Sequence, residues 1–106
     1  NDVQFFEAAR ALAERMLSES GKTNEEKITY LYRTVLSRKP DAEELKIVNK
    51  AFEKQRTLYM SKPEAAKNVV ETGESKPKRP VSDIEIAAWT MIANMVLNLD
   101  ETLTKQ

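Results

Sequence analysis

The sequence predicts an all-α fold, a single-domain bundle of about five helices around a central, largely buried C-terminal helix. Three observations predict it. Apolar residues recur at three- and four-residue spacing along the chain, the period of helices that bury one side. Two glycines and four prolines in 106 residues are too few for the tight turns of an all-β fold. Four capping-box patterns each stand directly before an apolar run.

One domain is expected over residues 1–106. This is a common length for one domain and is too short for two independent cores. Apolar residues make up 41% of the chain and charged residues 32%, which suffices for a packed interior and a hydrated surface. The chain opens almost directly into a helix pattern and has no initiator methionine there, so we expect it to be the C-terminal segment of a larger protein.

The first expected helix starts at a cap formed by Asn1 or Asp2 and ends at Gly21. Arg10 and Glu14 lie away from its apolar side. That apolar side consists of Phe5, Ala9, Leu12, Ala13 and Met16.

Two further helices follow, each behind a capping box. Thr23 and Glu26 open the second helix, which ends before Pro40 because the residue preceding a proline is pushed out of α geometry. Asp41 and Glu44 open a longer third helix. The inward residues are Ile28, Leu31, Tyr32, Val35 and Leu36 in the second helix, and Leu45, Val48, Phe52, Gln55 and Tyr59 in the third.

A short fourth helix is expected to begin at a capping box of Ser61 and Glu64, with Pro63 in its first turn, and to end at Gly73. Residues 74–80 (ESKPKRP) then form a polar loop with two prolines and no apolar side chain. This loop is expected to be exposed and mobile, and it connects two parts of one core.

The last helix, opened by Ser82 and Glu85, differs from the others because it has almost no polar side. A helix that is apolar nearly all round must be covered on most sides, so we place it at the centre. Thr90, Asn94 and Asn98 form a narrow polar line on it at four-residue spacing. Because an unpaired buried amide costs about 1–3 kcal/mol, this line should meet solvent or the backbone of a partner.

The composition excludes several kinds of site. The chain has no cysteine and no histidine, so it has no disulfide, no thiolate nucleophile, no Cys/His zinc site and no haem ligand of the usual kind. No cofactor is expected. Lysine plus arginine and aspartate plus glutamate both total 17, and this balance argues against a nucleic-acid partner. The apolar runs are far shorter than the roughly 20 residues that span a bilayer, so membrane insertion is not expected.

Asp100 and Glu101 are expected to follow the last helix, at its C-terminus, where the helix dipole disfavours negative charge. A basic side chain from a neighbouring helix is the simplest way to hold them there, and a contact site is the alternative. Together with Asn94 and Asn98 they are the candidate interaction residues. No catalytic, cofactor-binding or metal-binding residue is predicted.

Other charged groups have structural explanations. The acidic pairs at positions 25–26 and 43–44 fall in first turns of helices, where capping and the helix dipole favour acids. The basic residues Lys76, Lys78 and Arg79 are expected to be solvated in their loop. Arg38 can bind the last carbonyls of its helix or pair with an acid of the next one. Tyr30 lies off the apolar side of its helix, so it can be exposed.

Three stretches of the chain resemble the C-terminal part of the PSD-type domain of unknown function. They are residues 1–17 (NDVQFFEAARALAERML), 28–45 (ITYLYRTVLSRKPDAEEL) and 86–104 (IAAWTMIANMVLNLDETLT). Residues 98–101 correspond to the most recognisable motif of that family. Ser37 stands where glycine is common in the family, and Thr102 where phenylalanine is usual.

This resemblance implies a bacterial, secreted or envelope protein. The family occurs in large secreted proteins of planctomycete-like and related bacteria, often beside a planctomycete-type cytochrome c module. That module carries the haem, and the family transfers no catalytic residue to this chain. The resemblance therefore implies an extracytoplasmic accessory domain of a larger protein that is redox-linked or processes a polymer.

Three functions remain in competition. The first is a non-catalytic interaction module that binds the remainder of its own parent chain or another envelope protein. The second is a carboxylate-based hydrolase domain acting on polysaccharide, which requires two acids that converge in a cleft. The third is a helix-turn-helix nucleic-acid binder, which requires a positively charged side. The lack of catalytic chemistry favours the first, so we do not expect an enzyme.

Overall fold

A computed structural model describes residues 3–71 and 82–104, and within them it describes the side chains of residues 6–71 and 82–100. The described part of the chain contains five helices and no strand, which confirms the predicted all-α class. The helices are α1 (Val3–Glu19), α2 (Asn24–Leu36), α3 (Ala42–Ser61), α4 (Pro63–Val70) and α5 (Asp83–Thr104).

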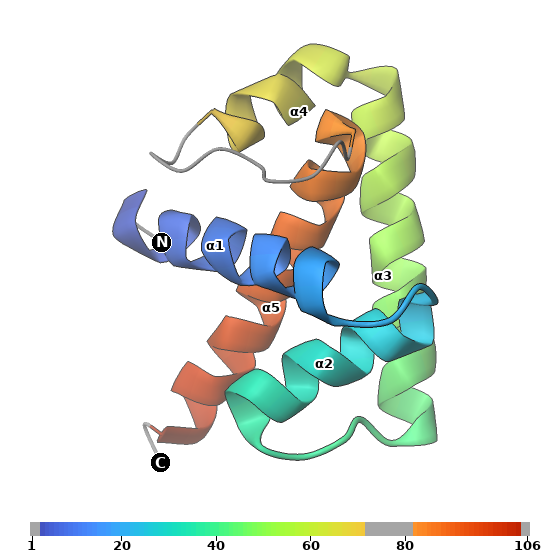
Figure 1. The fold of residues 1–106 in the computed structure, drawn as a ribbon, viewed down its shortest axis with the longest axis vertical. Coiled ribbons are helices and arrows are strands. Elements are labelled where there is room, and N and C mark those ends of the chain that lie inside the picture. The colour runs from blue at the N-terminus through green and yellow to red at the C-terminus, as the bar shows by residue number, and fades with distance from the viewer. Residues whose placement is uncertain (1–2, 72–81, 105–106) are drawn as a thin grey trace.

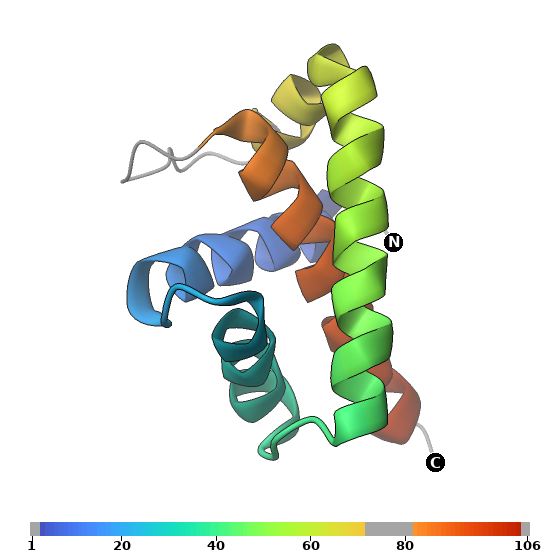
Figure 2. The same cartoon turned by 90° about the vertical axis from the view of Figure 1, so that its right-hand side faces the viewer.

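The fifth helix runs through the middle of the molecule and packs against each of the other four (Figure 1). α1 crosses α5 near its midpoint, while α2 and α4 lie towards opposite ends of the bundle. α3 runs along one side for almost the full height of the molecule, as Figure 2 shows. The Cα radius of gyration is 13.0 Å, about the value expected for a compact domain of this length. The predicted central position of the last helix is confirmed.

The core forms where α5 meets α1 and α3. Trp89 is fully buried and stacks on Phe52 of α3, with ring centroids 4.0 Å apart and the planes inclined by 22°. The ammonium of Lys27 lies 5.7 Å from the Trp89 ring, close enough for a cation–π interaction. Most of the buried apolar residues of α5 lie between Ile86 and Val96. Burial of this helix on several sides is what its apolar composition requires.

Two of the predicted capping boxes are present in full. At the start of α2, the Glu26 N–H donates to Thr23 Oγ1 over 3.1 Å, and the Thr23 N–H donates to Glu26 Oε1 over 3.0 Å. At the start of α3, the Glu44 N–H donates to Asp41 Oδ1 over 2.7 Å, and the Asp41 N–H donates to Glu44 Oε1 over 2.9 Å. Each box satisfies backbone donors that the first turn of a helix leaves open.

The predicted box of Ser61 and Glu64 is wrong. Ser61 is the last residue of α3, and its hydroxyl donates to the Leu58 carbonyl over 2.7 Å. The chain bends at Lys62, which is the N-cap of α4 and makes no side-chain capping bond. Pro63 occupies the first position of α4, as predicted. For the last predicted box, the Glu85 N–H donates to Ser82 Oγ over 3.1 Å, while the Glu85 carboxylate pairs with Arg56 of α3 at 2.9 Å.

The end of α1 also differs from its prediction. The helix ends at Glu19, and Gly21 does not have a positive φ. The Glu26 side chain instead lies where a Cβ at position 21 would be, so glycine makes room for the capping box of α2. The left-handed helix end occurs at Ser37, with φ 60° and ψ 29°, where the N–H donates to the Arg33 carbonyl over 3.2 Å. A residue with a Cβ is strained in this conformation.

Arg10 is the largest departure from the expected pattern of burial. It was placed off the apolar side of α1, yet it is almost completely buried. Its Nη1 donates to Glu14 Oε2 over 3.0 Å, one turn further along the helix. A buried guanidinium has to keep hydrogen-bonded partners because an unpaired buried charge is costly. α4 ends at Val70 with Glu71 as its C-cap, three residues before the predicted end at Gly73. The expected caps at residues 1–2 and the loop with its basic residues Lys76, Lys78 and Arg79 lie outside the described residues.

Candidate functional site

The predicted interaction residues all belong to α5. The helix continues to Thr104, so Asp100 and Glu101 lie within its last turns rather than after it, which corrects the sequence-based placement. The side chain of Glu101 lies outside the described side chains. Asp100 is half-buried, and the ion pairs formed between described side chains do not include it. The basic partner expected for Asp100 is therefore not among those pairs.

Helical spacing divides the candidate residues between two sides of α5. Asn94 and Asn98 are four residues apart and lie on one line, towards the side of the helix that packs less closely. Asp100 follows Trp89, Ala93 and Val96 at intervals of four, three and four residues, so it continues the line that faces the core. The structure thus brings the two asparagines together and places Asp100 on a different side.

The polar line on α5 is buried at one end and exposed at the other. Thr90 is fully buried, and its hydroxyl donates to the Ile86 carbonyl of the same helix over 2.6 Å. It therefore needs neither solvent nor a partner, which corrects the expectation for this residue. Asn94 is half-buried, and its Oδ1 has no hydrogen-bond donor among the described residues. Asn98 is exposed.

The core ends before α5 does. Val96 is fully buried, whereas Leu97 is half-buried and Leu99 is 39% exposed. Asn98 and Leu99 together therefore present one amide and one large apolar side chain at the C-terminal part of the helix. The prediction from sequence identified Asn98 but missed Leu99. The exposure of Leu99 depends on where the neighbouring helices end, which the apolar pattern of α5 alone does not show.

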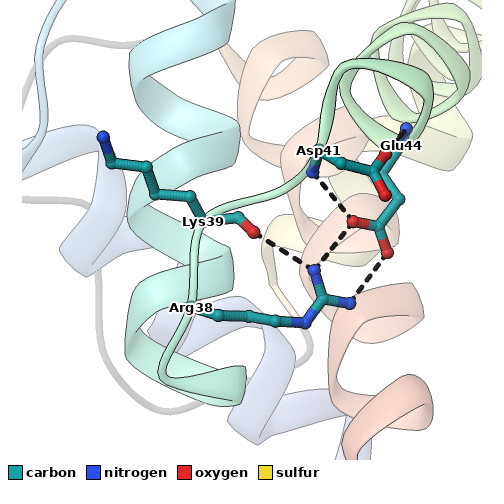
Figure 3. A network of polar contacts seen from close by, with 4 residues as sticks. All are labelled: Arg38, Lys39, Asp41 and Glu44. Carbon is teal, nitrogen blue, oxygen red and sulfur yellow. Dashed lines mark hydrogen bonds and ion pairs between the residues drawn. The ribbon is translucent and has the colours of Figure 1, made fainter.

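A second polar feature, the α2–α3 corner, comprises Arg38, Lys39, Asp41 and Glu44 (Figure 3). The Nη1 and Nη2 atoms of Arg38 donate to the two carboxylate oxygens of Glu44, each over 2.8 Å. Nη1 also donates to the Lys39 carbonyl over 3.1 Å, and the guanidinium lies 5.4 Å from the ring of Tyr32. One of the two alternatives foreseen for Arg38, pairing with an acid of the next helix, is present.

The electrostatics of this corner follow from that pairing. The Arg38 guanidinium and the Asp41 N–H, in that order, lower the pKa of the Glu44 carboxyl from 4.5 to about 2. The Glu44 carboxylate raises the pKa of Arg38 in turn. Both carboxylate oxygens of Glu44 are occupied by donors of the same corner. These hydrogen bonds connect the end of α2 to the start of α3, so they hold the two helices in place.

The hydrolase alternative requires two acids that converge in a cleft, and two acidic residues border one hollow of the described surface. An open hollow of about 440 Å³ lies beside α2, and Glu25 and Glu26 are among its lining residues. The backbone N–H of Thr23 holds the pKa of Glu26 below its ordinary value, opposite to the direction that a general acid requires. The Tyr30 hydroxyl in the same hollow donates to Glu19 Oε1 over 2.6 Å. The hydrolase remains a prediction without a structural argument in its favour.

Neither a metal-binding group nor a helix that could cross a membrane is found among the described residues. No group of three or more acidic side chains there is placed to hold a metal ion. None of the described helices has the length and apolar character needed to cross a membrane.

Fold and candidate site together define a small all-α helical domain that presents exposed side chains on a central helix. Comparison with known families adds one finding: residues 1–52 match the family PSD1, described as "Protein of unknown function (DUF1553)". The matched part comprises α1, α2 and the first half of α3, and it includes the first two stretches on which the sequence resemblance was based. It does not reach the third, residues 86–104. No curated protein and no solved structure matches the chain.

Proposed function

We propose that the chain is a non-catalytic helical module that binds another protein segment through the C-terminal part of α5. The observation that carries this proposal is the change in burial along that helix. All residues from Ile86 to Ala93 except the half-buried Met91 are buried, whereas Asn98 is exposed and Leu99 is 39% exposed. An apolar side chain beside an amide is a suitable small contact, since the first excludes water and the second fixes orientation.

The Asn94 amide contributes to the same surface. Its Oδ1 has no hydrogen-bond donor among the described residues, and an unsatisfied buried acceptor is stabilised when a donor becomes available to it. A partner that covers Asn98 and Leu99 would also cover the half-buried Asn94, one turn earlier on the same side as Asn98. Rotation of the Asn94 amide then lets its oxygen accept a hydrogen bond from the partner backbone. Asp100 lies on the core-facing line and is not part of this contact.

The partner and the location are inferred from the sequence resemblance alone. The partner is the remainder of the parent chain or another envelope protein, and the location is extracytoplasmic. The parent protein is redox-linked where it carries a separate planctomycete-type cytochrome c module. The chain itself then acts as an accessory domain, and the chemistry belongs to other parts of the protein.

The test is an NMR titration of the isotope-labelled chain with the separately expressed remainder of its parent protein. We expect amide shifts concentrated at Asn94, Asn98 and the neighbouring turns of α5. Leu99→Asp should weaken binding at least tenfold, because it places a charge in the apolar contact. Lys67→Ala on the exposed side of α4 is the matched control and should leave binding unchanged.

Two results would contradict the proposal. One is the absence of any shift with the remainder of the parent chain and with envelope extracts from the same bacterium. The other is binding that Leu99→Asp leaves intact while the variant keeps the melting temperature of the original chain.

A further inference from the structure

α3 has a second line of apolar side chains beside the one that faces the core. Ile47 is 59% exposed and Leu58 is 46% exposed, and both belong to the few large apolar residues that the described bundle leaves uncovered. Eleven residues separate them, which is three helical turns, so they lie on the same side of α3. Ala51, half-buried, lies between them on this line. The core-facing line of the same helix is distinct and consists of Val48, Phe52 and Tyr59.

Two lysines accompany this outer line. Lys50 and Lys54 are exposed and follow Ile47 by three and seven residues. Lys50 therefore borders the apolar side chains, and Lys54 lies on their line between Ala51 and Leu58. The ion pairs between described side chains include neither lysine. We name the set Ile47, Lys50, Ala51, Lys54 and Leu58 the α3 stripe. Ile47 to Leu58 spans roughly 16 Å along the helix axis.

The acids of α3 do not neutralise the stripe. Glu44 is paired with Arg38 at the α2–α3 corner. Glu53 lies on the side of α3 that faces α2, where it accepts a hydrogen bond from Asn24 over 3.4 Å. Glu43 is exposed one turn before Ile47 on the same side of α3, so it lies next to the N-terminal end of the stripe but outside its span from Ile47 to Leu58. Between Ile47 and Leu58 the stripe is therefore apolar and positively charged only.

Charge decides which occupant fits this surface. A second copy of the chain, packed by the same stripe about a two-fold axis, would bring Lys50 and Lys54 against the same lysines of its partner, which is repulsive. An anionic membrane is a poor match, because the chain has no net charge and the stripe has only two large apolar side chains and no aromatic one. An amphipathic helix with acidic residues beside its apolar line complements both features.

We propose that the α3 stripe binds an acidic amphipathic helix of a partner protein, with apolar residues between Ile47 and Leu58 and carboxylates opposite Lys50 and Lys54. The two helices pack side by side, as in ordinary helix pairs. This surface is separate from the α5 contact, and the inference does not depend on it. The partner is defined by its chemistry, three turns of helix with leucines on one side and glutamates along the border.

The test uses two synthetic helical peptides of the same length. Both carry leucine at positions i, i+4, i+7 and i+11, and one has glutamate and the other lysine at the bordering positions. In an NMR titration of the isotope-labelled chain, the glutamate peptide should shift the amides of residues 47–58. It should bind about tenfold more tightly than the lysine peptide at low salt, and this preference should decrease as salt is added.

A charge reversal checks the assignment to the stripe. The double variant Lys50→Glu and Lys54→Glu should invert the preference between the two peptides. The matched control, Lys22→Glu with Lys67→Glu, makes the same change of charge at exposed positions on other elements and should keep the original preference. Circular dichroism of both double variants establishes that the helical fold is retained. Leu99→Asp should leave peptide binding unchanged, which separates this result from the α5 proposal.

Three outcomes would overturn the inference. The first is equal binding of the two peptides, or no binding of either. The second is that vesicles containing phosphatidylglycerol, and not the peptides, shift the amides of residues 47–58, which would make the stripe a membrane contact. The third is sedimentation of the chain as a dimer that Ile47→Asp dissociates, which would make the stripe a self-association surface.

Discussion

The central helix and the α2–α3 corner are held in place by different physical means. α5 packs against four helices, and Thr90, a polar side chain in its buried part, bonds to the backbone of its own helix. The corner has little burial, and its geometry is set by hydrogen bonds of Arg38, Asp41 and Glu44 at 2.7–2.9 Å. The position of α5 depends on how much apolar area is removed from water. The geometry of the corner depends on hydrogen bonds, which are directional.

The difference shows that the interactions that contribute most to the stability of the fold are not those that fix where a helix begins. Burial of apolar area is the larger favourable term, but it does not depend on direction and cannot by itself fix where a helix begins. A capping box contributes about 1 kcal/mol and fixes the first residue of the helix. The core should therefore tolerate pH and salt but not loss of volume. The contribution of the corner to the free energy of unfolding should change with pH and with salt, and these changes should be smaller than the effect of removing a core side chain.

The largest effect is expected in the core. Trp89→Ala should lower the free energy of unfolding by about 3–5 kcal/mol, because it empties the volume that stacks on Phe52. Urea denaturation followed by circular dichroism measures this loss, which tryptophan fluorescence cannot do, since Trp89 is the one tryptophan of the chain. Trp89→Phe keeps an aromatic ring and should lose less. Met60→Ala, at a residue that is 53% exposed, should lose under about 1 kcal/mol. A loss below about 1 kcal/mol for Trp89→Ala would show that the stacked pair is not central to the core.

The cap of α3 should contribute less than the core. Asp41→Ala removes the acceptor of the Glu44 N–H and should lower the free energy of unfolding by about 1 kcal/mol. Asp41→Asn keeps an acceptor at this position and should retain most of that stability. Thermal or urea denaturation of the two variants makes the comparison. Equal losses for alanine and asparagine would mean that the hydrogen bond is not the source of the effect.

A stabilising change is expected at the end of α2. Ser37 is left-handed, with φ 60°, and glycine adopts this conformation without steric cost. Ser37→Gly should therefore raise the free energy of unfolding by about 0.5–1 kcal/mol. Ser37→Ala keeps the Cβ and should show no such gain. If both variants change stability alike, the gain cannot come from the backbone conformation.

The smallest effect is the pH dependence of the corner. The pKa of Glu44 is about 2 in the folded chain and 4.5 ordinarily, so between these values the unfolded chain binds more protons. The free energy of unfolding should therefore decrease as the pH falls from about 4.5 towards 2. In Glu44→Gln this decrease should be smaller, while Glu64→Gln on α4 controls for the loss of one acidic side chain. Because Arg38 and Glu44 are both partly solvated, the effect should be below that of Asp41→Ala. Identical slopes for all three chains between pH 2 and 4.5 would contradict it.

The elements that sequence predicted well depend on neighbours in the chain. The box of Thr23 and Glu26 requires two residues three positions apart, and the apolar composition of α5 requires no knowledge of the fold. Ser61 shows the limit of such local patterns. It satisfies the same motif, but α3 continues through it, and a bend at Lys62 starts the next helix.

The features that were missed depend on how helices cross. Arg10 was expected away from the apolar side of α1, yet it is buried. α1 crosses α5 near its midpoint (Figure 1). The apolar pattern of one helix does not show how wide its contact with a neighbouring helix will be. The candidate site shows the same limit. Asn98 could be predicted because it belongs to a polar line within its own helix. Leu99 required knowledge of where the neighbouring helices stop.

The order of the helices along the chain has a consequence for folding. α1 packs more extensively on α5, the last helix, than on α2, its neighbour in sequence. The contact that covers α1 therefore closes a loop of more than 60 residues, and the entropy of that closure has to be overcome before the core is complete. On a ribosome, α1 to α4 emerge first, and the parts of their apolar sides that pack on α5 stay uncovered until α5 leaves the exit tunnel. The domain is thus expected to fold late in its own synthesis, in one step that α5 triggers.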